Sequence, residues 1–277
     1  MLNPDQSYFT RILRWPIENY VHEIGINVMM PEYITTGLYL NDELLKEPEY
    51  LYKFYSPANY NFESIEAPYL YFGDPEQFND SFDCIVSEND YIQKFLDKKY
   101  LDDIGICNFS TVKTKKMWTF YTDKNQGFAV KYKNDKYFIP YSDKIAIRSH
   151  VLYLNKNVPD HPNLIEALKS IEGKHFPEPV KLWQHQVLMQ HDLCRKEKED
   201  FQWESEYRMI TFGREKINRR MEINPLAIDS VYIGHRMSKE NQERLLQILK
   251  KYSHVKVYKI IPNPKTQKFE EVRFKNI

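Results

Sequence analysis

Two glutamates, one residue apart, are the side chains whose type and spacing most clearly suggest chemistry. They are Glu204 and Glu206 in the segment QWESEYRMI, residues 202–210. If this segment is a strand, its side chains alternate between two faces, so both carboxylates and Arg208 share one face. Ile210 follows on that face, which places the carboxylates where the strand enters the core. Carboxylates at such a rim are candidates for shifted pKa values or ligand binding, although a surface charge ladder completed by Arg208 explains the same pattern.

Two further segments place polar groups beside aromatic rings. In FNDSFDC, Asn79, Asp80 and Asp83 suit either an Asx turn or a pocket that holds a ribose or a divalent ion. In MWTFYTDKNQGF, Trp118 and Tyr121 lie at helical offsets and either fill the core or stack on a flat ring. The sequence leaves both alternatives open for each segment.

The familiar motifs of several enzyme classes do not occur. The chain has no Walker-type loop, no GxGxxG and no GxSxG elbow, so phosphoryl transfer and serine hydrolysis have little support. His185 and His191 are six residues apart, so they do not form the i, i+4 pair of a zinc protease helix.

Composition places further limits on the function. The 277 residues are 42% hydrophobic, and 39 basic side chains balance 39 acidic ones, so the net charge neither favours nor excludes nucleic acid as a partner. No apolar run reaches the length of a membrane span, and the N-terminal residues do not read as an export signal. Three widely spaced cysteines fit a reducing compartment, so we expect a cytoplasmic protein without a membrane partner.

The hydrophobic patterns predict an α+β fold, with a mixed, mostly antiparallel sheet and packed helices. Residues 104–110 form a nearly continuous apolar run that is typical of a buried central strand. Residues 162–200 are predicted to be mostly helical, and Ser238 is predicted to cap an amphipathic helix between strands of the C-terminal third. We expect an N-terminal helical extension over residues 1–45, followed by a single α+β catalytic-like domain over residues 46–277.

Four segments together resemble the signature blocks of the bacterial "domain of unknown function 2971" family. They are LYKFYS (51–56), FNDSFDC (78–84), MWTFYTDKNQGFAVKY (117–132) and WESEYRMI (203–210). The resemblance covers roughly residues 50 to 260, and it departs from the family pattern at Tyr55, where arginine is usual, and at Ser81, where proline is usual. It implies a bacterial protein and supplies little chemistry.

A second, weaker similarity is to ADP-ribosyltransferases of the Arg–Ser–Glu type. Those enzymes carry, in order, a basic residue on an early strand, a Ser-Thr pair ending a central strand, and Glu-x-Glu on a later strand. Here the order is Lys53, then Ser110 and Thr111, then Glu204 and Glu206. The resemblance implies that the basic residue holds the NAD phosphates or ribose and that the serine orders the pocket. The second glutamate would bind the nicotinamide ribose, while the first would activate the acceptor.

We therefore expect an NAD-consuming enzyme, an ADP-ribosyltransferase or NAD glycohydrolase, that acts as a bacterial toxin or anti-phage defence effector. NAD is its expected substrate, and no metal is expected. Either a protein or a nucleic acid could be the acceptor of the ADP-ribosyl group. Glu206 and Glu204 are the expected catalytic residues. The residues expected to contact NAD are Lys53, Tyr55, Ser110, Thr111, Trp118, Tyr121, Asn79 and Asp80.

Two alternatives belong to other functional classes. A metal-dependent nuclease would use the carboxylates of Asp80, Asp83, Glu204 and Glu206 as ligands. A non-enzymatic binding module would use the same aromatic rings and carboxylates to recognise a nucleotide or a partner protein.

Overall fold

The computed structural model describes residues 39–40, 43–44, 47–78, 80, 82–84, 103–135, 138, 147–154, 169, 189, 192–213 and 216–274. Between residues 1 and 45 it describes only β1 (Tyr39–Leu40) and β2 (Glu43–Leu44), an antiparallel pair. The helices expected for the N-terminal extension therefore lie outside the described residues.

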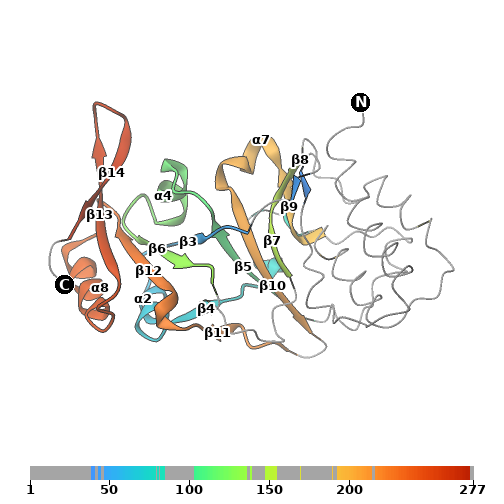
Figure 1. The fold of residues 1–277 in the computed structure, drawn as a ribbon, viewed down its shortest axis with the longest axis horizontal. Coiled ribbons are helices and arrows are strands. Elements are labelled where there is room, and N and C mark those ends of the chain that lie inside the picture. The colour runs from blue at the N-terminus through green and yellow to red at the C-terminus, as the bar shows by residue number, and fades with distance from the viewer. Residues whose placement is uncertain are drawn as a thin grey trace.

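An eight-stranded sheet forms the centre of the described fold (Figure 1). Its strands, in spatial order, are β14 (Lys268–Arg273), β13 (Lys256–Asn263), β12 (Ile228–Ile233), β6 (Phe128–Lys133), β3 (Tyr50–Tyr55), β5 (Asp103–Ser110), β10 (Glu206–Gly213) and β7 (Ile147–His150). Only β12 and β13 run parallel to each other, while the remaining neighbours are antiparallel. The predicted mixed, mostly antiparallel sheet is confirmed, and the apolar run at 104–110 is a central strand, as expected.

Helices cover both faces of this sheet. Helices α2 (Asn59–Glu66) and α8 (Lys239–Leu249) pack on one face, where their apolar side chains join those of β3 in the larger hydrophobic core. Helix α4 (Lys115–Tyr121) lies on the other face and contributes Trp118 to a second, smaller core. The cap predicted for α8 is confirmed, because the Ser238 hydroxyl accepts a hydrogen bond from the backbone N–H of Asn241 at 3.2 Å.

Smaller elements surround the sheet. They are strands β4 (Tyr69–Tyr71), β8 (Leu152–Leu154), β9 (Arg195–Glu197) and β11 (Arg220–Glu222), helix α7 (Lys198–Phe201), and the 3₁₀ turns η2 (Pro75–Gln77), η4 (Gln202–Glu204) and η5 (Pro225–Ala227). Strand β9 falls inside the region predicted to be mostly helical and pairs in parallel with β8. The prediction was wrong at these three residues, because pairing with β8 outweighs the helical preference of a Lys/Glu-rich segment.

Alternation along β10 divides its side chains between two environments. Tyr207 and Met209 belong to the larger core, on the face covered by α2 and α8. Glu206, Arg208 and Ile210 are therefore on the α4 face, and all three are buried. A carboxylate and a guanidinium are thus buried on the α4 face of the sheet.

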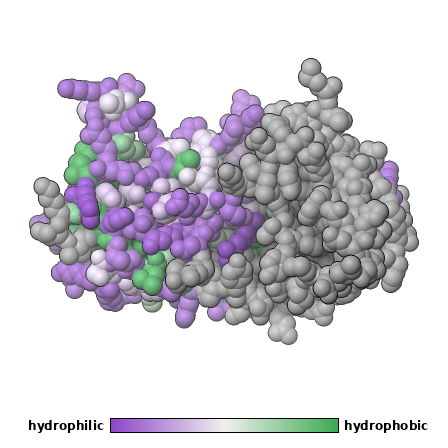
Figure 2. Space-filling model, viewed as in Figure 1, coloured by the Kyte–Doolittle hydropathy of each residue, from purple (hydrophilic) through white to green (hydrophobic). Residues whose placement is uncertain are grey.

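The described surface agrees with the charge-rich composition. Figure 2 shows mainly hydrophilic residues on the described part of this face, interrupted by small apolar areas. In the part of the chain that the structure describes, none of the helices has the length and apolar character needed to cross a bilayer.

The turn before β6 generates a stability prediction. A Cβ at Gly127 would lie 1.9 Å from the backbone oxygen of Tyr55, so any side chain would force β6 away from β3. We expect Gly127→Ala to lower the free energy of unfolding by roughly 3 kcal/mol, measured by urea denaturation. Gly73→Ala is the matched control, because its Cβ would meet its nearest neighbour, the Phe78 ring, at 3.4 Å. Equal stabilities of the two variants would contradict this packing.

Candidate functional site

The two predicted glutamates meet because of a turn between them. Glu204 ends η4, and Glu206 begins β10. Ser205 lies between them in the left-handed conformation, with φ 43° and ψ 53°. The strand expected to include Glu204 therefore starts two residues later, and the shared face of the two carboxylates comes from this turn rather than from strand alternation.

A lysine that the sequence reasoning did not select joins the two carboxylates. The Nζ atom of Lys196, on β9, lies 2.8 Å from Glu204 Oε2 and 2.9 Å from Glu206 Oε2. It also lies 3.3 Å from Asp83 Oδ2. Its side chain is 6% exposed, so these contacts form away from bulk water. One ammonium group thus lies close to three carboxylates, two from the η4–β10 turn and one from the distant loop that contains Asp83.

Arg208 completes what we call the ionic cluster, which comprises Asp83, Lys196, Glu204, Glu206 and Arg208. The fully buried guanidinium donates from Nε to Glu206 Oε1 at 2.8 Å and from Nη2 to Asp83 Oδ2 at 2.7 Å. The surface charge ladder considered for these residues is not formed, because Glu204, Glu206 and Arg208 are all buried. Arg208 contacts Glu206, whereas Lys196 contacts both glutamates.

The Ser-Thr pair at the end of β5 holds the backbone of this turn. Ser110 lies directly opposite Glu206 in the sheet, and its hydroxyl donates to the backbone oxygen of Glu204 at 2.6 Å. The backbone N–H and hydroxyl of Thr111 donate to the backbone oxygen of Ser205 at 2.9 and 3.0 Å. Four of the predicted residues, Ser110, Thr111, Glu204 and Glu206, therefore come together.

Two tyrosines extend the ionic cluster. The hydroxyl of Tyr121, on α4, donates to Glu204 Oε1, while the Tyr121 side chain remains 43% exposed at the surface. The hydroxyl oxygen of Tyr153, on β8, accepts from the backbone N–H of Glu206 at 2.7 Å. Burial raises the pKa of the Tyr121 hydroxyl, and the neighbouring Glu204 carboxylate raises it further. Tyr121 thus stays a hydrogen-bond donor at neutral pH and links the surface to Glu204.

The two glutamates differ in proton affinity. Burial raises the pKa of the Glu204 carboxyl. Lys196 lowers this pKa and the negative charge of Glu206 raises it, and the net effect is a raised pKa. Burial also disfavours ionisation of Glu206, but Arg208 and Lys196 outweigh it and hold the pKa of Glu206 below its ordinary 4.5. The same two cations likewise lower the pKa of the buried Asp83 carboxyl. A carboxylate pair with opposite shifts has the form of an acid–base pair at many active sites.

Charge balance in the ionic cluster explains this difference. Three carboxylates face two cations, and the surrounding carboxylates outweigh burial to raise the pKa of Lys196, which therefore keeps its proton. Asp83 and Glu206, which both contact Arg208, neutralise the two cations. Glu204 is the third carboxylate, so its negative charge is the least compensated.

Other predicted residues lie outside this arrangement. Tyr52 pairs with Ser110 and so shares the face of Glu206, which places Lys53 and Tyr55 on the opposite face. Lys53 Nζ donates to the backbone oxygen of Asn108 at 3.0 Å, and the Tyr55 hydroxyl is 2.9 Å from that of Tyr132. Lys53 and Tyr55 therefore lie away from the carboxylate pair and do not line a common site with Glu206.

The aromatic and Asx candidates divide in the same way. Trp118 is 1% exposed and packs edge-on against Phe54, which agrees with the core alternative considered for it. Asp80 accepts from the backbone N–H of Phe82 at 2.9 Å, as in the Asx-turn alternative, while Asp83 joins the ionic cluster. Asn79 lies outside the described residues.

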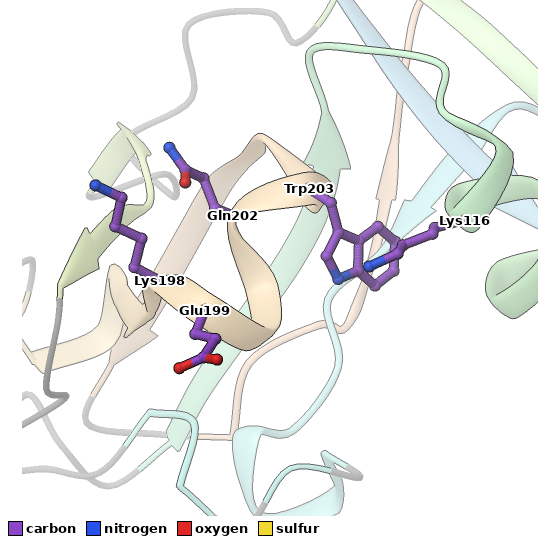
Figure 3. A pocket seen from close by; sticks show the side chains of 5 residues that line it. All are labelled: Lys116, Lys198, Glu199, Gln202 and Trp203. Atoms are coloured by element: carbon purple, nitrogen blue, oxygen red, sulfur yellow. The ribbon is translucent and has the colours of Figure 1, made fainter.

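Side chains of α4, α7 and η4 line a surface hollow that was not anticipated (Figure 3). Its volume is about 730 Å³, and it is lined by Lys116, Lys198, Glu199, Gln202 and Trp203. Trp203 immediately precedes Glu204. Nothing in the local sequence marked Lys196 or this hollow, because both depend on β9, α7 and α4 meeting in the fold.

Comparisons with known proteins do not identify a relative: no family model, no curated protein and no solved structure matches this chain. The resemblance to the domain of unknown function 2971 family stays a prediction. The functional argument therefore rests on the ionic cluster itself.

The charge balance generates a prediction on stability. Glu206→Gln removes one of the two carboxylates that contact both cations, and we expect it to lower the free energy of unfolding at pH 7 by roughly 3 kcal/mol or more. Glu204→Gln leaves two carboxylates with two cations, so we expect a change within about 1 kcal/mol. Urea denaturation measures both, and Glu243→Gln, at an exposed ion pair with Lys239, is the control.

The sign of the pH dependence follows from the lowered pKa of Glu206. Its stabilising contribution is present above the ordinary pKa of 4.5 and is lost as pH falls through the lowered value. The difference between wild type and Glu206→Gln should therefore shrink in acid. A larger loss of stability in Glu204→Gln than in Glu206→Gln would contradict the assignment of charges.

Proposed function

We propose that this chain cleaves the bond between nicotinamide and ribose in NAD, as an ADP-ribosyltransferase or NAD glycohydrolase. The observation that carries the proposal is the Glu204–Glu206 pair, held on one ammonium group with pKa values shifted in opposite directions. The Ser-Thr pair supports it, because Ser110 lies opposite Glu206 and bonds the backbone of Glu204.

Strand adjacency gives further support. The three segments that resemble Arg–Ser–Glu transferases lie on β3, β5 and the start of β10, which are neighbours in the sheet. Because Lys53 is on the opposite face, the phosphate-holding role needs another cation. We assign it to Lys113, whose ammonium lies 5.2 Å from the ring centre of Tyr52, on the face of Ser110 and Glu206. The same ammonium pairs with Glu271, so a phosphate would have to take the place of that carboxylate.

The chemistry fits these proton affinities. Breaking the bond between ribose C1′ and the nicotinamide nitrogen sends the electron pair to nicotinamide and leaves positive charge on the ribose. The ionised Glu206 carboxylate stabilises that charge. The acceptor hydroxyl, or water, then forms a bond to C1′ and gives its proton to Glu204, whose raised pKa suits a general base. Transfer to water yields ADP-ribose and nicotinamide.

The cellular setting is part of the same proposal. In the described structure Cys84, Cys107 and Cys194 are free thiols, which supports a reducing compartment such as the bacterial cytoplasm. NAD consumption there would fit a toxin or an anti-phage defence effector.

A nuclease is the second candidate because Asp83, Glu204 and Glu206 do converge. However, they converge on Lys196 Nζ, and Asp80 is used in a turn instead. Within the described ranges, no group of three or more His, Cys, Asp and Glu side chains has the arrangement of a metal site. Magnesium-dependent cutting of DNA or RNA that EDTA abolishes would favour this candidate.

A non-enzymatic module that binds a nucleotide or a protein is the remaining alternative. It predicts thermal stabilisation by the ligand without turnover. Stabilisation by NAD in the absence of any nicotinamide release would favour it over both enzymes.

Nicotinamide release tests the proposed function. Purified protein incubated with NAD should release nicotinamide, detected by chromatography, and Glu206→Gln should reduce the rate by at least about 10²-fold. Because this variant is expected to be less stable, its folding is checked by circular dichroism under the assay conditions. Glu206→Asp, which keeps the charge, should retain more activity than Glu206→Gln.

Glu243→Gln is the control and should match wild type. Wild-type protein that releases no nicotinamide would contradict the proposal. A folded Glu206→Gln variant with an undiminished rate would also contradict it.

A further inference from the structure

Three aromatic rings cluster at the surface immediately outside Glu204. The ring centre of Trp203 lies 5.6 Å from that of Phe120 and 6.3 Å from that of Tyr121. Phe120 is 68% exposed and Tyr121 is 43% exposed, so the cluster presents aromatic surface to water. Trp203 also lines the hollow, together with Lys116, Lys198, Glu199 and Gln202 (Figure 3). We call the three rings and this hollow the aromatic groove.

Lysines accompany the rings. Lys116 reaches from α4, and its Nζ lies 5.2 Å from the ring centre of Trp203, while Lys198 comes from α7 on the other side of the groove. Glu199 is the one carboxylate among the five residues that line the hollow, so cations outnumber it by two to one. The indole N–H of Trp203 donates to the backbone oxygen of Asp200 at 2.6 Å, and its half-buried ring is available to a ligand only where Phe120, Tyr121 and Lys116 do not cover it.

The aromatic groove opens on the side of Glu204 rather than that of Glu206. Tyr121, one of its rings, donates its hydroxyl hydrogen bond to Glu204. Trp203 precedes Glu204 in η4, so its ring and the Glu204 carboxylate are positioned by the same turn. A molecule bound against Trp203 would therefore lie beside Tyr121, whose hydroxyl contacts the buried carboxylate assigned as general base for the acceptor.

We propose that the aromatic groove binds a single-stranded nucleic acid segment and that this segment is the acceptor of the ADP-ribosyl group. Proteins that bind single strands without sequence preference stack the bases on aromatic side chains and place basic side chains along the phosphate backbone. The inference rests on the proposed function. In the transfer step, a hydroxyl or amino group of the nucleic acid forms a bond to ribose C1′, the bond to nicotinamide breaks, and the proton goes to Glu204.

Fluorescence anisotropy with labelled oligonucleotides tests this binding without NAD. The probes are a single-stranded DNA 10-mer, its RNA counterpart and the DNA duplex, and a single strand should bind more tightly than the duplex. Trp203→Ala should weaken single-strand binding by roughly 10-fold, while Trp203→Phe, which keeps a ring, should stay within about threefold. In the double variant Lys116→Ala, Lys198→Ala, the slope of log K against the logarithm of the salt concentration should become shallower by about one to two.

The matched control is Lys239→Ala, which removes an exposed lysine of α8 outside the groove and should bind like wild type. Labelled NAD then reports transfer to the bound strand. Label on the single strand, lost in Trp203→Ala and regained in Trp203→Phe, supports the inference.

Three results would overturn the inference. The first is a failure of single strands to bind, and the second is binding that Trp203→Ala does not change. The third is nicotinamide release with label on protein or water but never on the strand, which overturns the acceptor assignment alone. Failure of the proposed function is recognised separately, because then no nicotinamide is released with any acceptor.

Discussion

The contact of one buried ammonium group with three carboxylates is the interaction on which the site depends. Lys196 draws together Asp83, Glu204 and Glu206, which come from a loop, a 3₁₀ turn and a strand. Removing so many charges from water is costly, and it is tolerated because each carboxylate has a cationic partner and Arg208 supplies further hydrogen bonds. The ionic cluster therefore fixes β9, β10 and the 82–84 loop relative to one another.

The same cluster makes two chemically identical side chains unequal. Glu206 lies between two cations, whereas Glu204 has one cation and the neutral hydroxyl of Tyr121. This unequal environment lowers the pKa of one carboxyl and raises that of the other. Ordinary electrostatics thus favours the ionised form of Glu206 more than that of Glu204, and the proposed cleavage of NAD assigns the two carboxylates different roles on this basis.

Sequence patterns predicted the sheet better than they predicted the site. The apolar run of β5 and the cap of α8 depend on local residues, so both were recognised. The proximity of Glu204 and Glu206 was expected, but from alternation rather than from the left-handed turn at Ser205. Side chains alternate along a strand with a period of two, so an error of one residue places a side chain on the wrong face. This error affected Lys53, because its neighbour Tyr52 is the residue that pairs with Ser110. Lys196 had no local signal, because its role arises only when distant segments meet.

The most direct test of unequal glutamates is a carbon-detected NMR titration of their side-chain carboxyls. The two signals are assigned by comparison with Glu204→Gln and Glu206→Gln. We expect the carboxyl of Glu204 to titrate above the ordinary value of 4.5 and that of Glu206 to titrate below it. Both carboxyls titrating together near 4.5, or in the reverse order, would contradict the account.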